Sequence, residues 1–234
     1  MGFKILLFDI DGTLIVSGGA GRRAINAALA AAFGLEKPCV DVDFAGRTDL
    51  WILGEILRCN GLDAGPLNRD LLFDSYHRHL ADGLSRSQGR VLPGVRALLG
   101  ALETRPEFTV GLLTGNTEFA ARSKLRHHGL NQYFAFGAWG DASLHREDLA
   151  RQGYEQALER RTDRPDPAEV LIIGDTPRDV ACARAIGATC LAVGTGFADQ
   201  ADLKAAAPEF YLPDLSPLDQ VLDIFHHGSA TVLK

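Results

Sequence analysis

Four short apolar runs constrain the fold of this chain more than any other feature of its sequence. They lie at residues 4–8, 108–113, 170–173 and 189–193. None shows the alternation of polar and apolar residues that marks a half-exposed strand. Continuous apolar runs of this length are typical of parallel strands that are buried on both faces. The sequence therefore predicts a parallel β-sheet that is covered by helices on both sides.

The segments between these runs supply the helices that such a sheet needs. Helical patterns cover residues 95–102, 117–128, 146–161 and 179–186. The second pattern begins at Thr117, a good cap residue, and ends before Gly129. Strands that alternate with helices in this way indicate an α/β fold with a Rossmann-like, doubly wound parallel sheet.

One long insertion interrupts this alternation. About a hundred residues separate the first two strands, which is far more than one crossover connection needs. Residues 17–88 contain three helical patterns, at 21–33, 49–60 and 67–84, and no clear strand. The sequence therefore predicts an α-helical cap domain at residues 17–88, inserted into a core domain formed by residues 1–16 and 89–234. The connections at residues 15–19 and 88–94 are expected to act as hinges.

Charge and cysteine content exclude several classes of protein. The chain has 234 residues, a formal net charge of −6 and no basic run, so we expect no nucleic-acid or membrane partner. Its four cysteines form no CxxC pair, which favours reduced thiols in a cytoplasmic protein. We expect no signal peptide, and the longest uncharged stretch of the first half, residues 24–35, is shorter than the roughly 18 residues of a membrane span. A monomer or a homodimer is expected.

Polar residues follow three of the predicted strands at the point where each strand ends. Because ligands bind beyond the carboxyl ends of the strands in open α/β sheets, we expect these residues to meet at one edge. Gly12 allows the chain to turn sharply after the first strand. The set comprises Asp9 and Asp11 after the first strand, Thr114, Gly115 and Asn116 after the second, and Asp175 and Asp179 after the third.

Three carboxylates at this edge, those of Asp9, Asp11 and Asp175, would repel one another unless a cation lay between them. Oxygen ligands suit a hard cation, and Mg²⁺ is the usual choice in phosphate chemistry. Thr114 and the backbone amides of the next two residues are suited to donate hydrogen bonds to phosphoryl oxygens. Since a carboxylate beside a metal ion can act as a nucleophile, the residues indicate chemistry on a phosphate group.

Three motifs resemble those of the haloacid dehalogenase-like (HAD) hydrolase superfamily. FDIDGTL, LLTGN and IIGDTPRD stand in the order of three of its four motifs, each at the end of an apolar run. The resemblance covers essentially the whole chain, because the helical insertion is similar to the family's C1-type cap. It implies a capped phosphatase of the type that includes phosphoglycolate phosphatases and β-phosphoglucomutases.

The resemblance implies a role for each motif residue. Asp9 would attack phosphorus and become an aspartyl phosphate. Asp11 would protonate the leaving alcohol and then deprotonate the attacking water. Thr114 would bind a phosphoryl oxygen of the substrate. Mg²⁺ would be held by the Asp9 carboxylate, the Asp11 backbone carbonyl and Asp175, while Asp179 would support the metal site.

One motif departs from the family pattern. Members usually carry a lysine at the start of the helix before the GDxxxD strand, where it offsets the charge of the nucleophile and the phosphoryl group. The corresponding segment, GDASLHREDLARQGYEQALE, contains no lysine. Arg146 is the best substitute by position, because a guanidinium stays charged and holds an oxyanion through two hydrogen bonds.

The cap is expected to carry substrate specificity. In FAGRTDLWI, Arg47 precedes a predicted helix start, and related caps place a basic residue in this region against the distal part of the substrate. The leading hypothesis is a Mg²⁺-dependent phosphatase acting on a small phosphorylated metabolite. One alternative is a phosphomutase on a sugar phosphate, which needs the same Asp9 and Asp11. The other is a phosphate-binding protein without turnover, which only the missing lysine supports.

Overall fold

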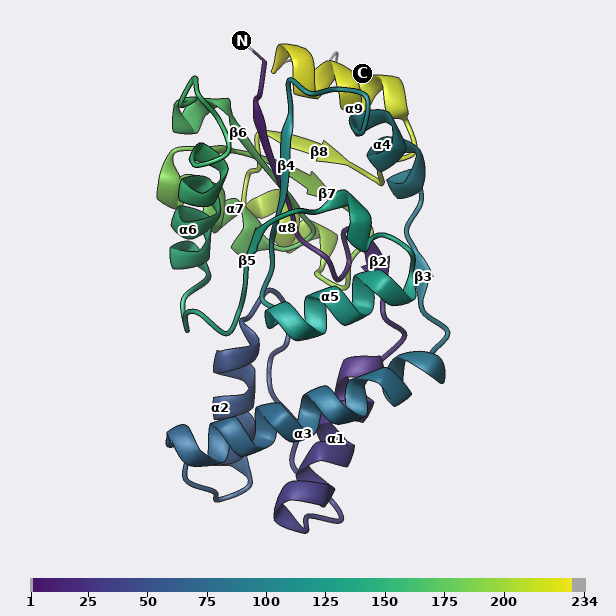
Figure 1. The fold of residues 1–234 in the computed structure, drawn as a ribbon, viewed down its shortest axis with the longest axis vertical. Helices are drawn as coiled ribbons and strands as arrows, with labels where there is room; N and C mark the ends of the chain where they lie inside the picture. The colour runs from purple at the N-terminus through teal and green to yellow at the C-terminus, as the bar shows by residue number, and fades with distance from the viewer. Residues whose placement is uncertain (1, 229–234) are drawn as a thin grey trace.

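A six-stranded parallel sheet organises residues 2–228, the part of the chain that the computed structural model describes (Figure 1). From one edge to the other the strands are β5 (Gly137–Ala138), β4 (Thr109–Leu113), β1 (Ile5–Phe8), β6 (Val170–Gly174), β7 (Thr189–Val193) and β8 (Phe210–Leu212). From β1 the chain first adds β4 and β5 along one lateral edge of β1, and it then adds β6, β7 and β8 along the other edge. The order of the strands therefore reverses at β1, and the crevice at its carboxyl end is the usual ligand site of such sheets.

Strand β1 is fully buried, and its side chains alternate between two hydrophobic clusters. Leu6 and Phe8 pack in a cluster with helices α4 (Val95–Leu102), α5 (Glu118–His127) and α9 (Leu218–His227). Ile5 and Leu7 pack on the other face, with helices α6 (Arg146–Leu158) and α7 (Pro177–Ile186). The doubly wound α/β fold predicted from the apolar runs is therefore confirmed.

Three helices lie beyond the carboxyl edge of the sheet and share a hydrophobic cluster of their own (Figure 1). They are α1 (Ala20–Phe33), α2 (Asp49–Cys59) and α3 (Pro66–Ser85). The two connections to the core run side by side, because β2 (Ile15–Val16) pairs with β3 (Arg90–Val91) in an antiparallel ribbon. Helix α5 lies between the sheet and these helices, and its Ala120 joins their cluster. We propose that residues 17–88 form the cap domain.

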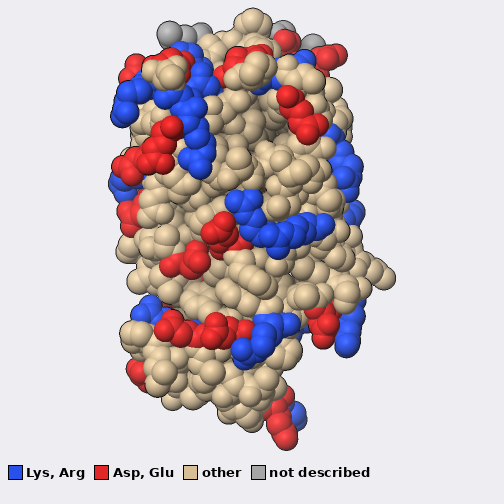
Figure 2. All heavy atoms as spheres, in the orientation of Figure 1, with Lys and Arg blue, Asp and Glu red and all other residues tan. Residues whose placement is uncertain are grey.

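Short elements complete the core. Helix α8 (Gln200–Ala205) joins β7 to β8, and two 3₁₀ turns cover Asn131–Tyr133 and Pro167–Glu169. Helix α6 ends at Leu158, about one turn before the predicted end at residue 161. Among the helices of residues 2–228, none has the length and apolar character needed to cross a membrane. Figure 2 shows basic and acidic side chains interspersed over one face of the molecule. The oligomeric state and the cytoplasmic location stay predictions.

Candidate active site

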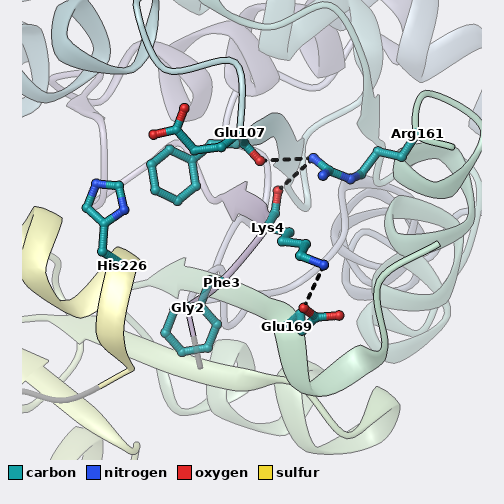
Figure 3. A pocket seen from close by; sticks show the side chains of 8 residues that line it. Gly2, Phe3, Lys4, Glu107, Arg161, Glu169 and His226 are labelled. Atoms are coloured by element: carbon teal, nitrogen blue, oxygen red, sulfur yellow. Dashed lines mark hydrogen bonds and ion pairs between the residues drawn. The ribbon is translucent and has the colours of Figure 1, made fainter. Parts of the chain in front are cut away.

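A hollow of about 300 Å³ opens at the amino ends of the strands, opposite the motif residues (Figure 3). Its lysine and its arginine both have partners. Lys4 Nζ lies 2.9 Å from Glu169 Oε1 and 3.3 Å from Asp163 Oδ2, and Arg161 donates to the backbone oxygen of Glu107 over 3.0 Å. Because Lys4 and Arg161 are held by these contacts, and because ligands of such sheets bind beyond the carboxyl ends of the strands, we assign the hollow a structural role.

At the carboxyl edge of the sheet, a buried arginine joins two buried carboxylates. Asp9 directly follows β1, Arg146 opens α6 and Asp179 lies in the first turn of α7, and each is less than a tenth exposed. Arg146 Nη2 lies 2.9 Å from Asp9 Oδ2 and 2.6 Å from Asp179 Oδ1. Burial raises the pKa of Asp9 to about 6, although the charge of Arg146 opposes this rise. The structure thus places a fixed positive charge against the predicted nucleophile.

Asp175 completes a cluster of three carboxylates. Asp9, Asp175 and Asp179 each offer an oxygen within 4.8 Å of the others, and all three are buried. Burial, followed by the charges of Asp179 and Asp9, raises the pKa of Asp175 well above its ordinary value. A cation in the cluster would remove this repulsion. The close spacing of three buried carboxylates is therefore consistent with a binding site for a hard metal ion.

The hydrogen bonds of the cluster indicate which of its carboxylates are free to bind a metal ion directly. Both oxygens of Asp179 are occupied, since Oδ1 contacts Arg146 and Oδ2 accepts from the Thr176 amide and hydroxyl at 2.9 and 2.7 Å. A side chain at Gly196 would lie 1.7 Å from Asp175 Oδ2, so the neighbouring loop has to pass as bare backbone. The donor set fits Mg²⁺ held by Asp9 and Asp175, with Asp179 orienting the groups around it.

Asp11 lies apart from this cluster and is held by other partners. Its side chain is 36% exposed. Lys124 Nζ and Asn116 Nδ2 contact Asp11 Oδ2 at 2.5 and 2.9 Å, while Ser17 donates to Oδ1 over 3.1 Å. Burial raises the pKa of Asp11, but the charge and hydrogen bond of Lys124 outweigh it and leave the pKa below the ordinary value. Asp11 is therefore the accessible carboxylate of the site.

Lys124 is one of the residues that the sequence analysis missed. It is 5% exposed, and its ammonium group also contacts Asn116 Oδ1 at 2.5 Å. The family pattern predicts a cation only in the segment before the GDxxxD strand. The pattern of the helix over residues 117–128 could have indicated Lys124, because Ala121 and Leu125 lie on a buried face that includes position 124. A lysine on a buried face needs a charged partner.

The threonine motif is a buried part of the site, and its residues are hydrogen-bonded to one another. Thr114 is fully buried, and its Oγ1 accepts hydrogen bonds from the side-chain amide of Asn116 at 2.9 Å and from its backbone amide at 3.3 Å. Gly115 contacts the cap, because a Cβ there would lie 1.9 Å from the backbone oxygen of Arg47. The side-chain amide of Asn116 donates to both Asp11 and Thr114. The predicted binding of the phosphoryl group by Thr114, Gly115 and Asn116 stays a proposal.

The cap is docked on the core through the start of α2. The amides of Asp49 and Leu50 donate to the carbonyls of Gly115 and Gly140 over 2.6 and 3.1 Å. In return, the Thr117 amide donates to Asp49 Oδ2 over 2.9 Å. Amides in the first turn of a helix have no partner within the helix, so the core loops satisfy them. These bonds hold the start of α2 against the loops that follow β4 and β5.

Arg47 lies in the same docked segment, but its contacts remain with neighbouring cap residues. Its guanidinium lies 4.1 Å from the centre of the Trp51 ring, and its Nε lies 3.6 Å from Asp43 Oδ2. That Nε is buried without a hydrogen-bond partner among the described residues. The structure therefore places Arg47 at the junction of cap and core, and substrate binding by Arg47 stays a prediction.

Replacing Asp49 by asparagine should stabilise the protein, and more so at neutral pH than in acid. Burial raises the pKa of Asp49 from 3.8 to about 6. A raised acid pKa means that ionisation costs stability as the pH rises through this window, and the cost is complete above it. The asparagine oxygen can still accept the Thr117 amide. We expect a gain of about 1–2 kcal/mol in the free energy of unfolding at about pH 7.5, and little at about pH 4. Urea unfolding at both pH values measures it, and a gain independent of pH would contradict this account.

Comparisons with known proteins identify the family of this chain. The sequence profile of the haloacid dehalogenase-like hydrolase family matches residues 3–187. A phosphoglycolate phosphatase of Synechococcus elongatus is 32% identical over 224 residues, which span 94% of this chain and 97% of that protein. A 5′-nucleotidase of Pseudomonas aeruginosa is 29% identical over 225 residues, which span 93% and 95%. The chain therefore belongs to the haloacid dehalogenase-like hydrolase family.

Solved structures share the fold. A predicted phosphoglycolate phosphatase of Haemophilus somnus superposes with a TM-score of 0.73 at 16% identity, covering 94% of this chain and 98% of that one. CbbY of Rhodobacter sphaeroides, solved in complex with phosphate, gives a TM-score of 0.74 at 19% identity, covering 92% and 96%. Within its family the protein is a phosphatase, a hydrolase of phosphoric monoesters.

Proposed function

We propose that the protein hydrolyses a small phosphate monoester in two steps, through an aspartyl phosphate at Asp9 and with Mg²⁺ as cofactor. The observation that carries this proposal is the pairing of two carboxylates with two different cations at the end of one strand. Asp9 contacts Arg146 at 2.9 Å, and Asp11 contacts Lys124 at 2.5 Å. The two carboxyl groups therefore have different surroundings. Arg146 and a cation in the acidic cluster would keep Asp9 ionised for attack, while the more exposed Asp11 can exchange protons with the substrate and with water.

In the first step, the Asp9 oxygen that Arg146 does not contact attacks phosphorus. The bond from phosphorus to the ester oxygen breaks, and the leaving oxygen takes a proton from Asp11. Asp11 acquires that proton from solvent as the substrate binds, because the negative charge of the bound phosphate favours the protonated form of a neighbouring carboxyl group. In the second step, Asp11 takes a proton from water, which attacks the same phosphorus and releases inorganic phosphate and the free Asp9 carboxylate. Arg146 stays charged throughout, because the carboxylates of Asp179 and Asp9 hold its pKa well above the ordinary value against the effect of burial.

Bound Mg²⁺ would supply positive charge that offsets the phosphoryl oxygens and the acidic cluster. Removing divalent cations with a chelator should therefore abolish phosphate release, and added Mg²⁺ should restore it. Chelation should also lower the melting temperature, because three buried carboxylates would then share only the charge of Arg146. Thermal unfolding with and without Mg²⁺ measures this second effect. Phosphate release that persists at full rate in the chelator would rule out the metal requirement.

The relatives suggest which substrates to test first. The similarity to a phosphoglycolate phosphatase at 32% identity supports 2-phosphoglycolate. The similarity to a 5′-nucleotidase at 29% identity supports nucleoside 5′-monophosphates as the second candidate. A cap docked directly on the loops around Asp11 favours a small leaving group.

The experiment is phosphate release from 2-phosphoglycolate, a nucleoside 5′-monophosphate, a sugar phosphate and p-nitrophenyl phosphate. The proposed function expects Mg²⁺-dependent release, with the highest kcat/KM for one of the first two esters. Isomerisation of the sugar phosphate without release would favour the phosphomutase alternative. Binding of inorganic phosphate with no turnover of any ester would favour the phosphate-binding alternative.

A further inference from the structure

Lys124 has no part in the two steps above, although it is a buried charge within the site. Its side chain is 6% exposed, and its ammonium group contacts Asp11 Oδ2 and Asn116 Oδ1, both at 2.5 Å. Burying an ammonium group is costly unless it is paired with a charge and with hydrogen bonds. The fold thus holds a cation on the carboxylate that transfers protons, in addition to the arginine on the nucleophile.

The position of Lys124 is fixed by the helix that carries it. The Thr117 hydroxyl caps α5 by accepting from the Ala120 amide over 3.1 Å. Ala121 and Leu125 pack in the core cluster, while Ala120 packs among the cap helices. Helix α5 therefore contacts both parts of the molecule, and its lysine has little freedom to move relative to the sheet.

Asp11 has no comparable anchor of its own. It follows β1 at a turn, where Gly12 adopts a φ of 86°, and its side chain is the most exposed of the four site carboxylates. A carboxylate on a single methylene can rotate between several staggered positions. A charged hydrogen bond of 2.5 Å restricts that rotation much more than a neutral one does. The remaining donors, Asn116 and Ser17, are uncharged.

We propose that Lys124 is a positioning residue that fixes the Asp11 side chain at the place where it exchanges a proton with the leaving group. This inference rests on the proposed phosphatase function. Lys124 Nζ contacts the carboxylate and the Asn116 amide oxygen at once, so it also orients the amide that donates to Asp11 over 2.9 Å. Loss of the lysine would release both groups.

The consequence is a dependence on the leaving group. An alkyl ester such as 2-phosphoglycolate expels a poor leaving group, which needs the proton from Asp11. p-Nitrophenyl phosphate expels a stable phenolate, which does not. The value of kcat/KM depends only on the steps up to and including formation of the aspartyl phosphate. A misplaced Asp11 should therefore lower kcat/KM for the alkyl ester alone. The second step needs Asp11 with every substrate, so kcat should fall for both.

The experiment compares Lys124→Met with Arg126→Met, an exposed residue on the same helix. For Lys124→Met we expect kcat/KM to fall about 100-fold on the alkyl ester, which is the range of general acid catalysis, with little change on p-nitrophenyl phosphate. A burst of p-nitrophenol should precede slow turnover. Arg126→Met should match the wild type with both esters. Equal losses of kcat/KM on the two esters, or no loss, would overturn the inference.

A crystal structure of Lys124→Met provides a test that does not depend on activity. We expect the Asp11 carboxylate to turn away from its wild-type position or to adopt several positions, while Asp9 and Arg146 keep theirs. An unmoved Asp11 would contradict the positioning role. If the wild type cleaves neither ester, the proposed function fails at that point, and the crystal structure still decides whether Lys124 fixes Asp11.

Discussion

Replacing Asp9 by asparagine should abolish hydrolysis of every phosphate ester while the protein stays folded. The amide keeps the size of the side chain but cannot attack phosphorus, and loss of a nucleophile lowers kcat by about 10⁴-fold or more. Arg146 keeps its contact of 2.6 Å with Asp179, so it is not left without a partner. Because burial raises the pKa of Asp9 to about 6, its charge costs stability at neutral pH. The melting temperature should therefore be equal to that of the wild type or higher.

Phosphate release and thermal unfolding together test this prediction. Asp70→Asn is the matched control, since Asp70 is exposed on α3 and undergoes the same chemical change. It should keep the activity of the wild type. An Asp9→Asn protein that retains a substantial part of the wild-type rate would show that another group attacks phosphorus.

Replacing Arg146 by methionine should have the second largest effect, on stability as well as on turnover. Without the guanidinium, the carboxylates of Asp9, Asp175 and Asp179 remain buried together without a positive charge. Removing one partner of a buried ion pair costs about 3–5 kcal/mol. Activity should fall as well, because no fixed charge would then offset the phosphoryl group at Asp9. Chemical denaturation without divalent cations measures the loss of stability.

Magnesium and lysine provide the controls for Arg146. Added Mg²⁺ should raise the melting temperature of Arg146→Met more than that of the wild type, because the ion replaces part of the missing charge. Arg146→Lys restores the residue that is usual in the family and should recover part of the activity. Arg146→Met with the stability and activity of the wild type would contradict the assigned role.

The central strands could be predicted because each is a continuous apolar run with both faces buried. β1, β4, β6 and β7 begin and end within one residue of the predicted limits. The edge strands β5 and β8 were not predicted, since they have only two and three residues. Such short segments become strands through pairing with β4 and β7, and that pairing depends on the tertiary fold rather than on a local pattern.

In the site too, the residues that could be predicted are those marked by the local sequence, and the ones that were missed depend on tertiary contacts. Asp9, Asp11 and Asp175 were found because they follow strands, and parallel strands bring their carboxyl ends to one edge. Arg146 was found from its expected place at a helix start. Lys124 and Asp49 were not found, because their partners lie 113 and 68 residues away in the sequence. Their roles depend on how α5 and the cap dock on the core.

The most direct test of the account is to trap the phosphorylated enzyme. Asp11→Asn should still accept the phosphoryl group from p-nitrophenyl phosphate, whose leaving group needs no proton, but it should hydrolyse the intermediate slowly. After rapid quenching, mass spectrometry of the proteolysed protein should find the phosphoryl group on Asp9. A burst of p-nitrophenol without phosphorylated Asp9, or with the phosphoryl group on a different residue, would contradict the proposed mechanism.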